Sequence, residues 1–280
     1  LTEALLFKEM SMKHYKKVLT IAGSDSGGGA GIQADIKTMS ACGCYAMSAI
    51  TAITAQNTVG VSRIHNVPAD MVAAQIAAVL EDIGVDAVKL GMLPTEASVV
   101  AIAGLLKKYE VTNVVLDPVM VSTSGSRLID EPAAESIRIH LFPLATVVTP
   151  NIPETEYLTG LKIGSEADFA GAAVAMSQQR VRAVLFKAGH LDGETLTDYL
   201  FDDEKLIRHY RYGRINTLNT HGTGCSLSSA IASYLALEYP LAEAVQLAEN
   251  YLHKAILNGC EYRLGHGHGP VHHFYKWWAE

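Results

Sequence analysis

Short apolar segments alternate with helical segments along most of this 280-residue chain, and this alternation restricts the possible folds more than any other feature. Apolar segments typical of buried strands lie at 17–23, 86–92, 113–120 and 183–189. Between them, segments such as 69–84 and 95–110 carry apolar residues three or four positions apart, which is helical spacing. Short buried strands that alternate with helices form a mostly parallel sheet covered on both faces. We therefore predict an α/β fold of three layers (αβα), with a mostly parallel central sheet and helices on both faces.

The remaining segments fit the same architecture. Further strands are predicted at 45–54 and 145–151, and further helices at 30–43, 132–141, 153–160, 166–180, 224–237 and 241–258. The segment 195–212 differs, because its pattern predicts an antiparallel hairpin that turns at Asp202–Glu204. Thr95 is the predicted cap of the helix at 95–110. No linker or repeat divides the chain, so we predict one domain over 13–280, preceded by an extension at 1–12.

The net charge of −7 and the four cysteines restrict the partners and the compartment. Nucleic acids and anionic membranes bind basic patches, so neither is expected to be the main partner of an acidic chain. No uncharged apolar run of about 20 residues occurs, so no membrane span is predicted. The cysteines, at 42, 44, 225 and 260, include no C-x-x-C pair and do not resemble a disulfide framework, which favours a reducing compartment. We predict a soluble cytoplasmic protein.

Polar residues follow the predicted strands at the points where the strands end. They are Asp25, Gln56, Asn57, Asp117, Asn151, Glu154 and Lys187. In open α/β sheets, ligands bind in the crevice beyond the carboxyl ends of the strands. All seven residues are therefore expected at the same edge of the sheet, where they form the candidate site.

The glycine-rich segment 23–35 precedes a helix but does not contain the P-loop pattern G-x-x-x-x-G-K-[ST]. Residues 29–34 fit G-x-G-x-x-A, which raises the alternative of a dinucleotide site. Such a site needs an acidic residue about 20 positions further on, and no Asp or Glu lies between Asp35 and Asp70. Two interpretations remain: a flexible turn from strand to helix, or a backbone that closes over a small ligand and lets Asp35 hydrogen-bond to it.

The segment HGTGC at 221–225 opens a predicted helix and is suited to binding an anion. Glycines allow successive N–H groups to point into one concavity, and the helix N-terminus adds about half a positive charge. That arrangement stabilises the charge on a transferring phosphoryl group. Cys225 at this position is expected to have a lowered pKa and a reactive thiol. The alternatives are an ordinary helix start and a small core cysteine.

Three other features have both a functional and a structural interpretation. Asp117 and Glu154 offer the oxygen ligands that Mg²⁺ prefers, although each also fits a helix cap or a turn. Lys187 lies at the end of a predicted strand, where its positive charge could bind phosphate groups. The alternative is an ordinary surface lysine. The histidines of the C-terminal segment, His266, His268, His272 and His273, have no cysteine or acid at a spacing typical of zinc sites.

Eight segments carry a resemblance to a known family. In order along the chain they are TIAGSDSGGGAGIQADIKT, TAQNTVGV, KLGML, VLDPVM, TPNIPE, KAGH, NTHGTGC and GPVHHFYKWW. Together they resemble the hydroxymethylpyrimidine/phosphomethylpyrimidine kinases of thiamine biosynthesis, which belong to the ribokinase-like superfamily. The resemblance runs from Lys17 to Trp278 and leaves out only the N-terminal end. It implies a ribokinase-like domain, often a homodimer, that uses Mg·ATP to phosphorylate 4-amino-5-hydroxymethyl-2-methylpyrimidine and then its monophosphate.

The resemblance also implies roles for individual residues. The pyrimidine is expected to contact Gly23, Asp35, Gln56, Met92 and Val119. ATP is expected to contact Lys187, Asn151 and Thr223, while Mg²⁺ and its waters are expected at Asp117 and Glu154, beside Asn151. Gly222, Thr223 and Gly224 would form the anion hole. Cys225 stands where many ribokinase-like enzymes carry an aspartate as general base. The resemblance therefore implies that the Cys225 thiolate takes the proton from the substrate hydroxyl. We expect this role to be partial, because the negative charge of bound phosphates raises the pKa of a thiol.

Two other functions remain open at this point. A pyridoxal-type kinase shares the scaffold and a hydroxymethyl-substituted ring. Gln56 favours the aminopyrimidine, because an amide pairs with a ring nitrogen and an exocyclic amine together. The second alternative is a non-catalytic protein that senses the pyrimidine. Such a sensor is expected to have lost the phosphate-binding residues, which this chain retains.

Overall fold

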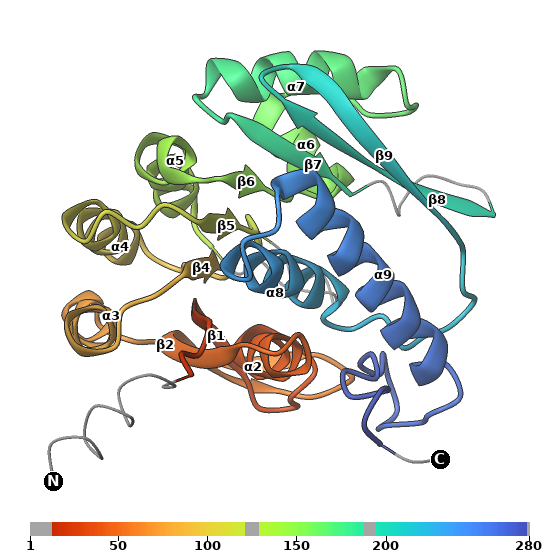
Figure 1. Cartoon of the computed structure of the whole chain (residues 1–280), viewed down its shortest axis with the longest axis horizontal. Helices are drawn as coiled ribbons and strands as arrows, with labels where there is room; N and C mark the ends of the chain where they lie inside the picture. Colours follow the sequence, from red (N-terminus) through yellow and green to blue (C-terminus); the bar gives the residue numbers. More distant parts are fainter. Residues whose placement is uncertain (1–12, 121–128, 188–193, 279–280) are drawn as a thin grey trace, which may run out of the picture.

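The computed structural model describes residues 13–120, 129–187 and 194–278. These residues contain one sheet of nine strands, in the order β3-β2-β1-β4-β5-β6-β7-β8-β9 (Figure 1). The strands are β1 (Lys17–Asp25), β2 (Tyr45–Gln56), β3 (Val61–Asn66), β4 (Ala87–Leu90), β5 (Val114–Leu116), β6 (Val147–Val148), β7 (Ala183–Phe186), β8 (Thr195–Asp202) and β9 (Lys205–Gly213). The α-helices are α2 (Gly31–Ala41), α3 (Ala69–Asp82), α4 (Glu96–Lys108), α5 (Glu131–His140), α6 (Ile152–Thr159), α7 (Asp168–Gln178), α8 (Thr223–Ala236) and α9 (Leu241–Gly259).

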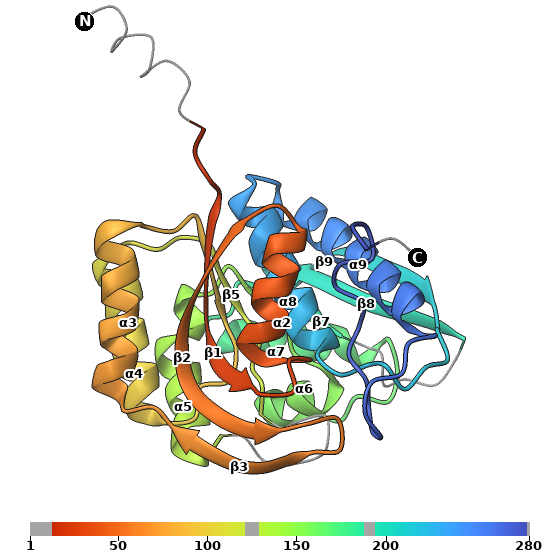
Figure 2. The same cartoon turned by 90° about the horizontal axis from the view of Figure 1, so that it is seen from below.

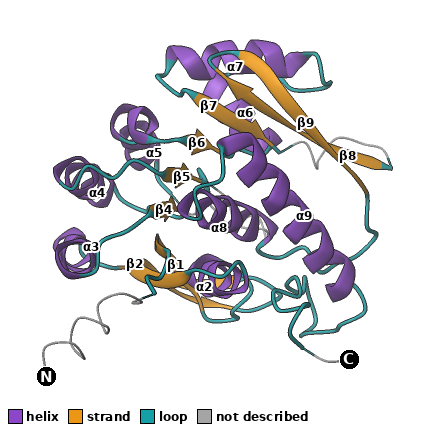
Figure 3. Ribbon diagram, viewed as in Figure 1, coloured by secondary structure: helices purple, strands orange, loops and turns teal. Residues whose placement is uncertain are grey.

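The centre of the sheet is parallel and both of its edges are antiparallel. Strands β2, β1, β4, β5, β6 and β7 pair in parallel with one another. Strand β3 pairs antiparallel with β2, and β8 and β9 continue the sheet antiparallel to β7. Helices α3, α4 and α5 cover one face, while α2, α8 and α9 cover the other (Figure 3). The predicted three-layer α/β fold is confirmed.

Alternate residues of the central strands belong to two separate hydrophobic cores. Leu19 and Ile21 of β1 pack in the core that contains α3 and α4, whereas Val18 packs in the core that contains α2 and α8. In β7, Phe186 belongs to the first core and Leu185 to the second. Because strands buried on both faces need apolar residues at every position, their sequences read as continuous apolar runs.

Two local predictions are confirmed. Strands β8 and β9 form a hairpin that turns at Asp203 and Glu204, both of which have positive φ (45° and 66°). Positive φ at both central residues is the geometry of turns that match the twist of a hairpin. Thr95 caps α4, with its hydroxyl oxygen 3.3 Å from the N–H of Ser98.

The structure differs from the predicted strands in two places. Strand β3 was not predicted, because it lies at the edge of the sheet and its residues are almost all exposed, so no apolar pattern marks it (Figure 2). The strand predicted at 145–151 is reduced to the two residues of β6. The chain leaves the sheet there because Asn151 already caps α6.

The predicted extension at 1–12 lies outside the described residues, and the assignment of 13–280 to one domain stays a prediction. Among the residues that the structure describes, no helix has the length and apolar character needed to cross a membrane.

Candidate active site

A cavity of about 1100 Å³ lies beyond the carboxyl ends of the parallel strands. Six of the seven residues predicted at this edge line it, namely Asp25, Gln56, Asp117, Asn151, Glu154 and Lys187. Asn57 instead turns its side chain onto its own loop, where its carbonyl oxygen accepts hydrogen bonds from the N–H groups of Val59 and Gly60. These six residues lie at or just after the carboxyl ends of five strands, β1, β2, β5, β6 and β7, as the sequence predicts.

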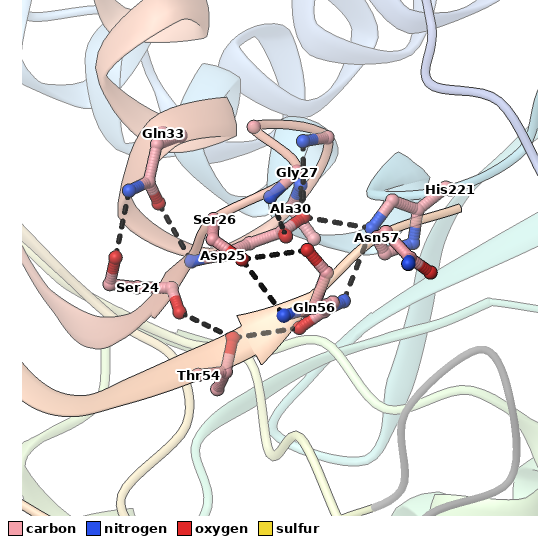
Figure 4. Close-up of polar contacts among 12 residues, drawn as sticks. Ser24, Asp25, Ser26, Gly27, Ala30, Gln33, Thr54, Gln56, Asn57 and His221 are labelled. Atoms are coloured by element: carbon pink, nitrogen blue, oxygen red, sulfur yellow. Dashed lines mark hydrogen bonds and ion pairs between the residues drawn. The ribbon is translucent and has the colours of Figure 1, made fainter. Parts of the chain in front are cut away.

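Asp25 organises the glycine-rich loop that follows β1 (Figure 4). Its carboxylate accepts hydrogen bonds from the N–H groups of Gly27 (2.7 Å), Gly29 (3.0 Å) and Ala30 (2.8 Å). Burial alone would raise the pKa of Asp25, but the hydrogen bonds from His221 and from the loop amides outweigh it and hold this pKa below its ordinary value. Asp25 therefore stays ionised and fixes the shape of the loop.

The second glycine loop packs directly against the first. Gly222, at the start of α8, has φ of 79°, and a Cβ added there would lie 1.9 Å from the carbonyl oxygen of Gly29. Only glycine permits both the positive φ and this close approach. Nε2 of His221 lies 2.9 Å from the Asp25 carboxylate, which joins the two loops a second time. The two glycine segments found in the sequence thus form one structure.

The first turn of α8 faces the cavity through Thr223, Gly224 and Cys225. The N–H groups of a first helical turn have no partner within the helix, and the helix dipole adds positive potential there. A Cβ on Gly224 would lie 3.3 Å from Nζ of Lys187, so the lysine stands beside this turn. A concavity of amides with a cation next to it is suited to bind phosphate groups.

Lys187 forms an ion pair of 2.8 Å with Asp117; the Asp117 side chain is almost fully buried, and that of Lys187 is partly buried. Burial alone would lower the pKa of Lys187, but the carboxylates of Asp117 and Glu154 raise it above its ordinary value. Burial would likewise raise the pKa of Asp117, yet Lys187 and Lys89 hold it below its ordinary value. The pair is therefore fully charged inside the cavity.

Glu154 and Asn151 form a capping box at the start of α6. Asn151 accepts a hydrogen bond from the N–H of Glu154 at 2.9 Å, and the Glu154 carboxylate accepts one from the N–H of Asn151 at 2.8 Å. Burial raises the pKa of Glu154 to about 7; Lys187 opposes this rise and the negative charge of Asp117 adds to it. Glu154 therefore takes part in the cap of α6, and it also lines the cavity.

Gln56 lines the same cavity and is the last residue of β2 (Figure 4). Its side-chain oxygen accepts a hydrogen bond from the hydroxyl of Thr54 at 3.1 Å, and its amide nitrogen lies 3.3 Å from Nε2 of His221. Gly23, Met92 and Val119, the other residues expected around a small substrate, line the same cavity. Thr54 and Gln56 of β2 thus line one cavity with Gly23 of β1, with Met92 after β4 and with Val119 after β5.

A family model described as phosphomethylpyrimidine kinase matches residues 25–272 of this chain. The chain belongs to the phosphomethylpyrimidine kinase family. The resemblance found in the sequence is thereby confirmed, and so is the prediction of a kinase.

Known relatives of this kinase cover almost its whole length. The hydroxymethylpyrimidine/phosphomethylpyrimidine kinase of Rhizobium meliloti is 51% identical over 263 residues, which is 94% of this chain and 98% of the relative. The crystal structure of a phosphomethylpyrimidine kinase from Clostridium difficile is 47% identical with a TM-score of 0.75, and the match covers 86% of this chain and 99% of that one. The pyridoxal kinase of Staphylococcus aureus, in complex with AMP-PCP and pyridoxal, is 34% identical with a TM-score of 0.86, over 95% of this chain and 96% of that one.

The position of Asp35 in this kinase differs from the one expected. Asp35 is fully buried and does not line the cavity. Its carboxylate accepts hydrogen bonds from Lys89 (2.9 Å to each oxygen), from the hydroxyl of Thr20 (2.6 Å) and from the hydroxyl of Ser229 (2.7 Å). The expected hydrogen bond from Asp35 to the pyrimidine is thus not supported: the acid lies behind the wall and is occupied by these three partners.

Lys89 is one of the cavity residues to which the sequence analysis gave no role. It is fully buried on β4 and lines the cavity. Burial alone would lower the pKa of Lys89, but Asp35 outweighs it and the lysine stays charged. A lysine within the apolar run AVKL was itself a signal, because a buried charge needs a partner of opposite sign.

The expected low pKa of Cys225 is wrong. Burial raises the pKa of this thiol to about 11; Lys89 lowers it, whereas Asp35 and Asp117 raise it further. The loss of water on burial is the largest effect, and together with the two buried carboxylates nearby it outweighs the lowering by Lys89. Cys225 is therefore a protonated thiol in the cavity at neutral pH.

Alkylation of Cys225 by iodoacetamide is expected to accelerate about tenfold per pH unit from pH 7 to pH 10 without levelling, because only the thiolate reacts. Mass spectrometry of the tryptic peptide gives the rate, with N-acetylcysteine in the same solution as the control. The free thiol has a lower pKa than Cys225, so its rate should begin to level within this pH range. A Cys225 rate that is already flat above pH 7 contradicts the raised pKa.

Proposed function

We propose that this kinase transfers a phosphoryl group from ATP to the hydroxymethyl group of 4-amino-5-hydroxymethyl-2-methylpyrimidine, and then phosphorylates the resulting monophosphate to the diphosphate. One observation supports this most strongly: Gln56 lines the same cavity as Lys187 and the first turn of α8, which form its phosphate end. A small aminopyrimidine bound at Gln56 therefore has its hydroxyl in the same cavity as phosphates bound at Lys187 and α8. Membership of the family and the names of the relatives support the same substrates.

The residues of the chain act by placement and by charge. The amide of Gln56 pairs with the ring nitrogen and the amino group of the pyrimidine, and Gly23, Met92 and Val119 pack around the ring. Lys187, Asn151 and the N–H groups of Gly222, Thr223 and Gly224 hold the phosphates of ATP. In the transfer, the hydroxyl oxygen bonds to the γ-phosphorus as the bond to the β–γ bridging oxygen breaks, and the same amides and Lys187 stabilise the charge on the transferred group.

Cys225 contributes to proton transfer only in part. With a pKa of about 11, its thiolate is a small fraction at neutral pH. Phosphoryl transfer requires little covalent chemistry from the protein and depends mainly on positioning and charge stabilisation. We therefore assign most of the acceleration to the anion hole and Lys187, and place the thiol next to the hydroxyl that loses its proton.

The residues at the phosphate end also suit Mg²⁺. Asp117 and Glu154 supply carboxylate oxygens, and a site of one or two carboxylates completed by phosphates and water is typical of this ion. Among the described residues no group of three or more His, Cys, Asp or Glu side chains forms a metal site, so the ion would be held largely by the nucleotide. When bound, Mg²⁺ neutralises charge on the β- and γ-phosphates. We further propose a cytoplasmic homodimer, as the charge, the free cysteines and the family resemblance favour.

The test is phosphate transfer from Mg·ATP to the pyrimidine alcohol, to its monophosphate and to pyridoxal, with wild type and Cys225→Ala. We expect turnover of both pyrimidines and a clear preference over pyridoxal, with the variant losing more of the first step than of the second, which uses a phosphate oxygen as nucleophile. A preference for pyridoxal would place this chain with the pyridoxal kinase from Staphylococcus aureus. Tight pyrimidine binding without any turnover of ATP supports a sensor instead.

A further inference from the structure

The sequence GHGHGP at 265–270 carries a glycine at every second position, and the proposed function gives it no role. It belongs to the segment that follows α9 and leads to the C-terminus (Figure 1). Residues 265–270 are called the C-terminal glycine segment below. Among the described residues its two histidines belong to no group of three or more metal ligands, so a metal does not account for this segment. The packing of its three glycines does.

Gly265 and Gly267 pack against Thr58, in the loop between β2 and β3. A Cβ on Gly265 would lie 2.2 Å from the Thr58 hydroxyl oxygen, and a Cβ on Gly267 would lie 2.0 Å from the Thr58 carbonyl oxygen. The hydroxyl also accepts hydrogen bonds from the N–H groups of His266 and Gly267, both at 3.2 Å. The carbonyl accepts one from the N–H of His268 at 2.9 Å. Only glycine allows the two backbones to approach so closely.

The other end of the C-terminal glycine segment binds the loop that leads into α8. The carbonyl oxygen of Gly269 accepts a hydrogen bond from the N–H of His221 at 3.0 Å, and His221 pairs with Pro270 in a parallel β-bridge. A Cβ on Gly269 would lie 2.1 Å from the side-chain oxygen of Asn219. The side-chain nitrogen of Asn219 donates to two carbonyl oxygens at the end of α9 and just beyond it, both at 2.7 Å. The loop before the anion hole is thus fixed to the C-terminal part of the chain.

The chain just after this segment is anchored to two buried helices. His273 is only 4% exposed, and its Nε2 lies 3.1 Å from the hydroxyl oxygen of Ser226 on α8. Its carbonyl oxygen accepts a hydrogen bond from the hydroxyl of Tyr251 on α9 at 3.0 Å. Thr58, in contrast, lies in a loop that joins the edge strand β3 to the sheet. The end of the segment at α8 is therefore the fixed one, and the loop of Thr58 is the part that the segment positions.

The two loops that the C-terminal glycine segment joins carry different parts of the cavity. Gln56 lies two residues before Thr58, and Gly222 follows His221, whereas neither Thr58 nor any of residues 265–270 is among the described residues that line the cavity. We propose that this segment sets the position of Gln56 relative to the anion hole, and that Thr58 is a positioning residue that acts through Gln56. The inference rests on the proposed function for the roles of Gln56 and the anion hole. A misplacement of about 1 Å can cost a hundredfold in rate, so such positioning matters.

The test is titration calorimetry of the full chain with the pyrimidine alcohol and, separately, with ADP. Thr58→Val keeps the shape of the side chain and removes its oxygen, so it is expected to weaken binding of the alcohol about tenfold, the equivalent of one hydrogen bond of Gln56, and to leave the affinity for ADP unchanged. Thr58→Ser keeps the acceptor and should bind the alcohol as wild type does. A purely structural role would reduce the fraction of folded protein, which lowers the stoichiometry of binding but not the affinity.

Gly267→Ala separates the segment from the loop without a change at Thr58 itself. The φ of Gly267 lies outside the left-handed region, so an added Cβ meets only the contact with the Thr58 carbonyl. This variant should also weaken the alcohol and spare ADP, because the end of the segment at α8 stays anchored. Gly104→Ala is the control: its φ is likewise not left-handed, it is exposed on α4, and no described atom lies within 4 Å of an added Cβ. It should change neither affinity.

The inference is overturned if Thr58→Val and Gly267→Ala bind the alcohol as wild type does, or if they weaken ADP as much as the alcohol. Failure of the proposed function gives different results. A wild type that binds and phosphorylates pyridoxal alone overturns the proposed function, and the same titrations with pyridoxal then support or refute the role of Thr58. A wild type that binds the pyrimidine without turnover of ATP also overturns it, and the titrations stand as they are. A wild type that binds neither alcohol overturns both.

Discussion

Gly222→Ala is expected to lower kcat for phosphoryl transfer by at least about a hundredfold while the protein remains folded. A Cβ at this position would lie 1.9 Å from the carbonyl oxygen of Gly29, so one of the two glycine loops must move. In the proposed function the loops carry the amides that stabilise the transferred phosphoryl group, and loss of one donor from an oxyanion hole costs about a hundredfold to a thousandfold in kcat, about 2.7–4 kcal/mol. Steady-state kinetics with ATP and the pyrimidine alcohol measure the effect.

Gly160→Ala is the matched control for this substitution. Gly160 ends α6 with φ of 72°, close to the 79° of Gly222, but nothing lies within 4 Å of an added Cβ. Both variants therefore carry the same backbone strain of about 1–2 kcal/mol, and only Gly222→Ala carries the clash. Equal kcat for the two variants would show that the contact between the glycine loops does not position the anion hole.

The elements with a regular spacing of apolar residues could be predicted from the sequence. Strands such as β1 and β7 are buried on both faces, so their apolar runs stand out, and the helices between them show their buried face at helical spacing. Strand β3 carries no such signal because its pairing with β2 is through the backbone and its side chains face solvent. Edge strands of this kind follow from tertiary structure alone.

The residues of the candidate site that lie at the ends of strands were predictable from the sequence. Asp117 and Lys187 follow β5 and β7, and the topology of a parallel sheet brings such positions together whatever the details of packing. The pKa of Cys225 was not predictable, because it depends on how deeply the thiol is buried and on two carboxylates that are distant in sequence. The exclusion of Asp35 from the cavity has the same origin: Lys89, 54 residues further on, occupies its carboxylate.

The second large effect is expected from this ion pair, and it concerns stability. Lys89 and Asp35 are both 0% exposed, with Nζ 2.9 Å from the carboxylate. Removal of one partner from a buried pair leaves an uncompensated charge in the interior, which costs about 3–5 kcal/mol. Lys89→Met is therefore expected to lower the free energy of unfolding by about this amount, measured by urea denaturation with the slope checked for two-state behaviour.

Two further variants separate the buried charge from the loss of packing. Lys162→Met removes a lysine that is 90% exposed from an ion pair of 3.0 Å with Glu156, and the midpoint of unfolding should change little, because exposed pairs contribute little. Asp35→Asn combined with Lys89→Met should recover part of the stability lost in Lys89→Met, since no charge is then left unpaired in the core. If the double variant is as unstable as the sum of the two single variants, the pair is not coupled and Lys89 stabilises the wall of the cavity through packing alone. Recovery of stability without recovery of kcat would, in contrast, show that the lysine is needed at the cavity for its charge.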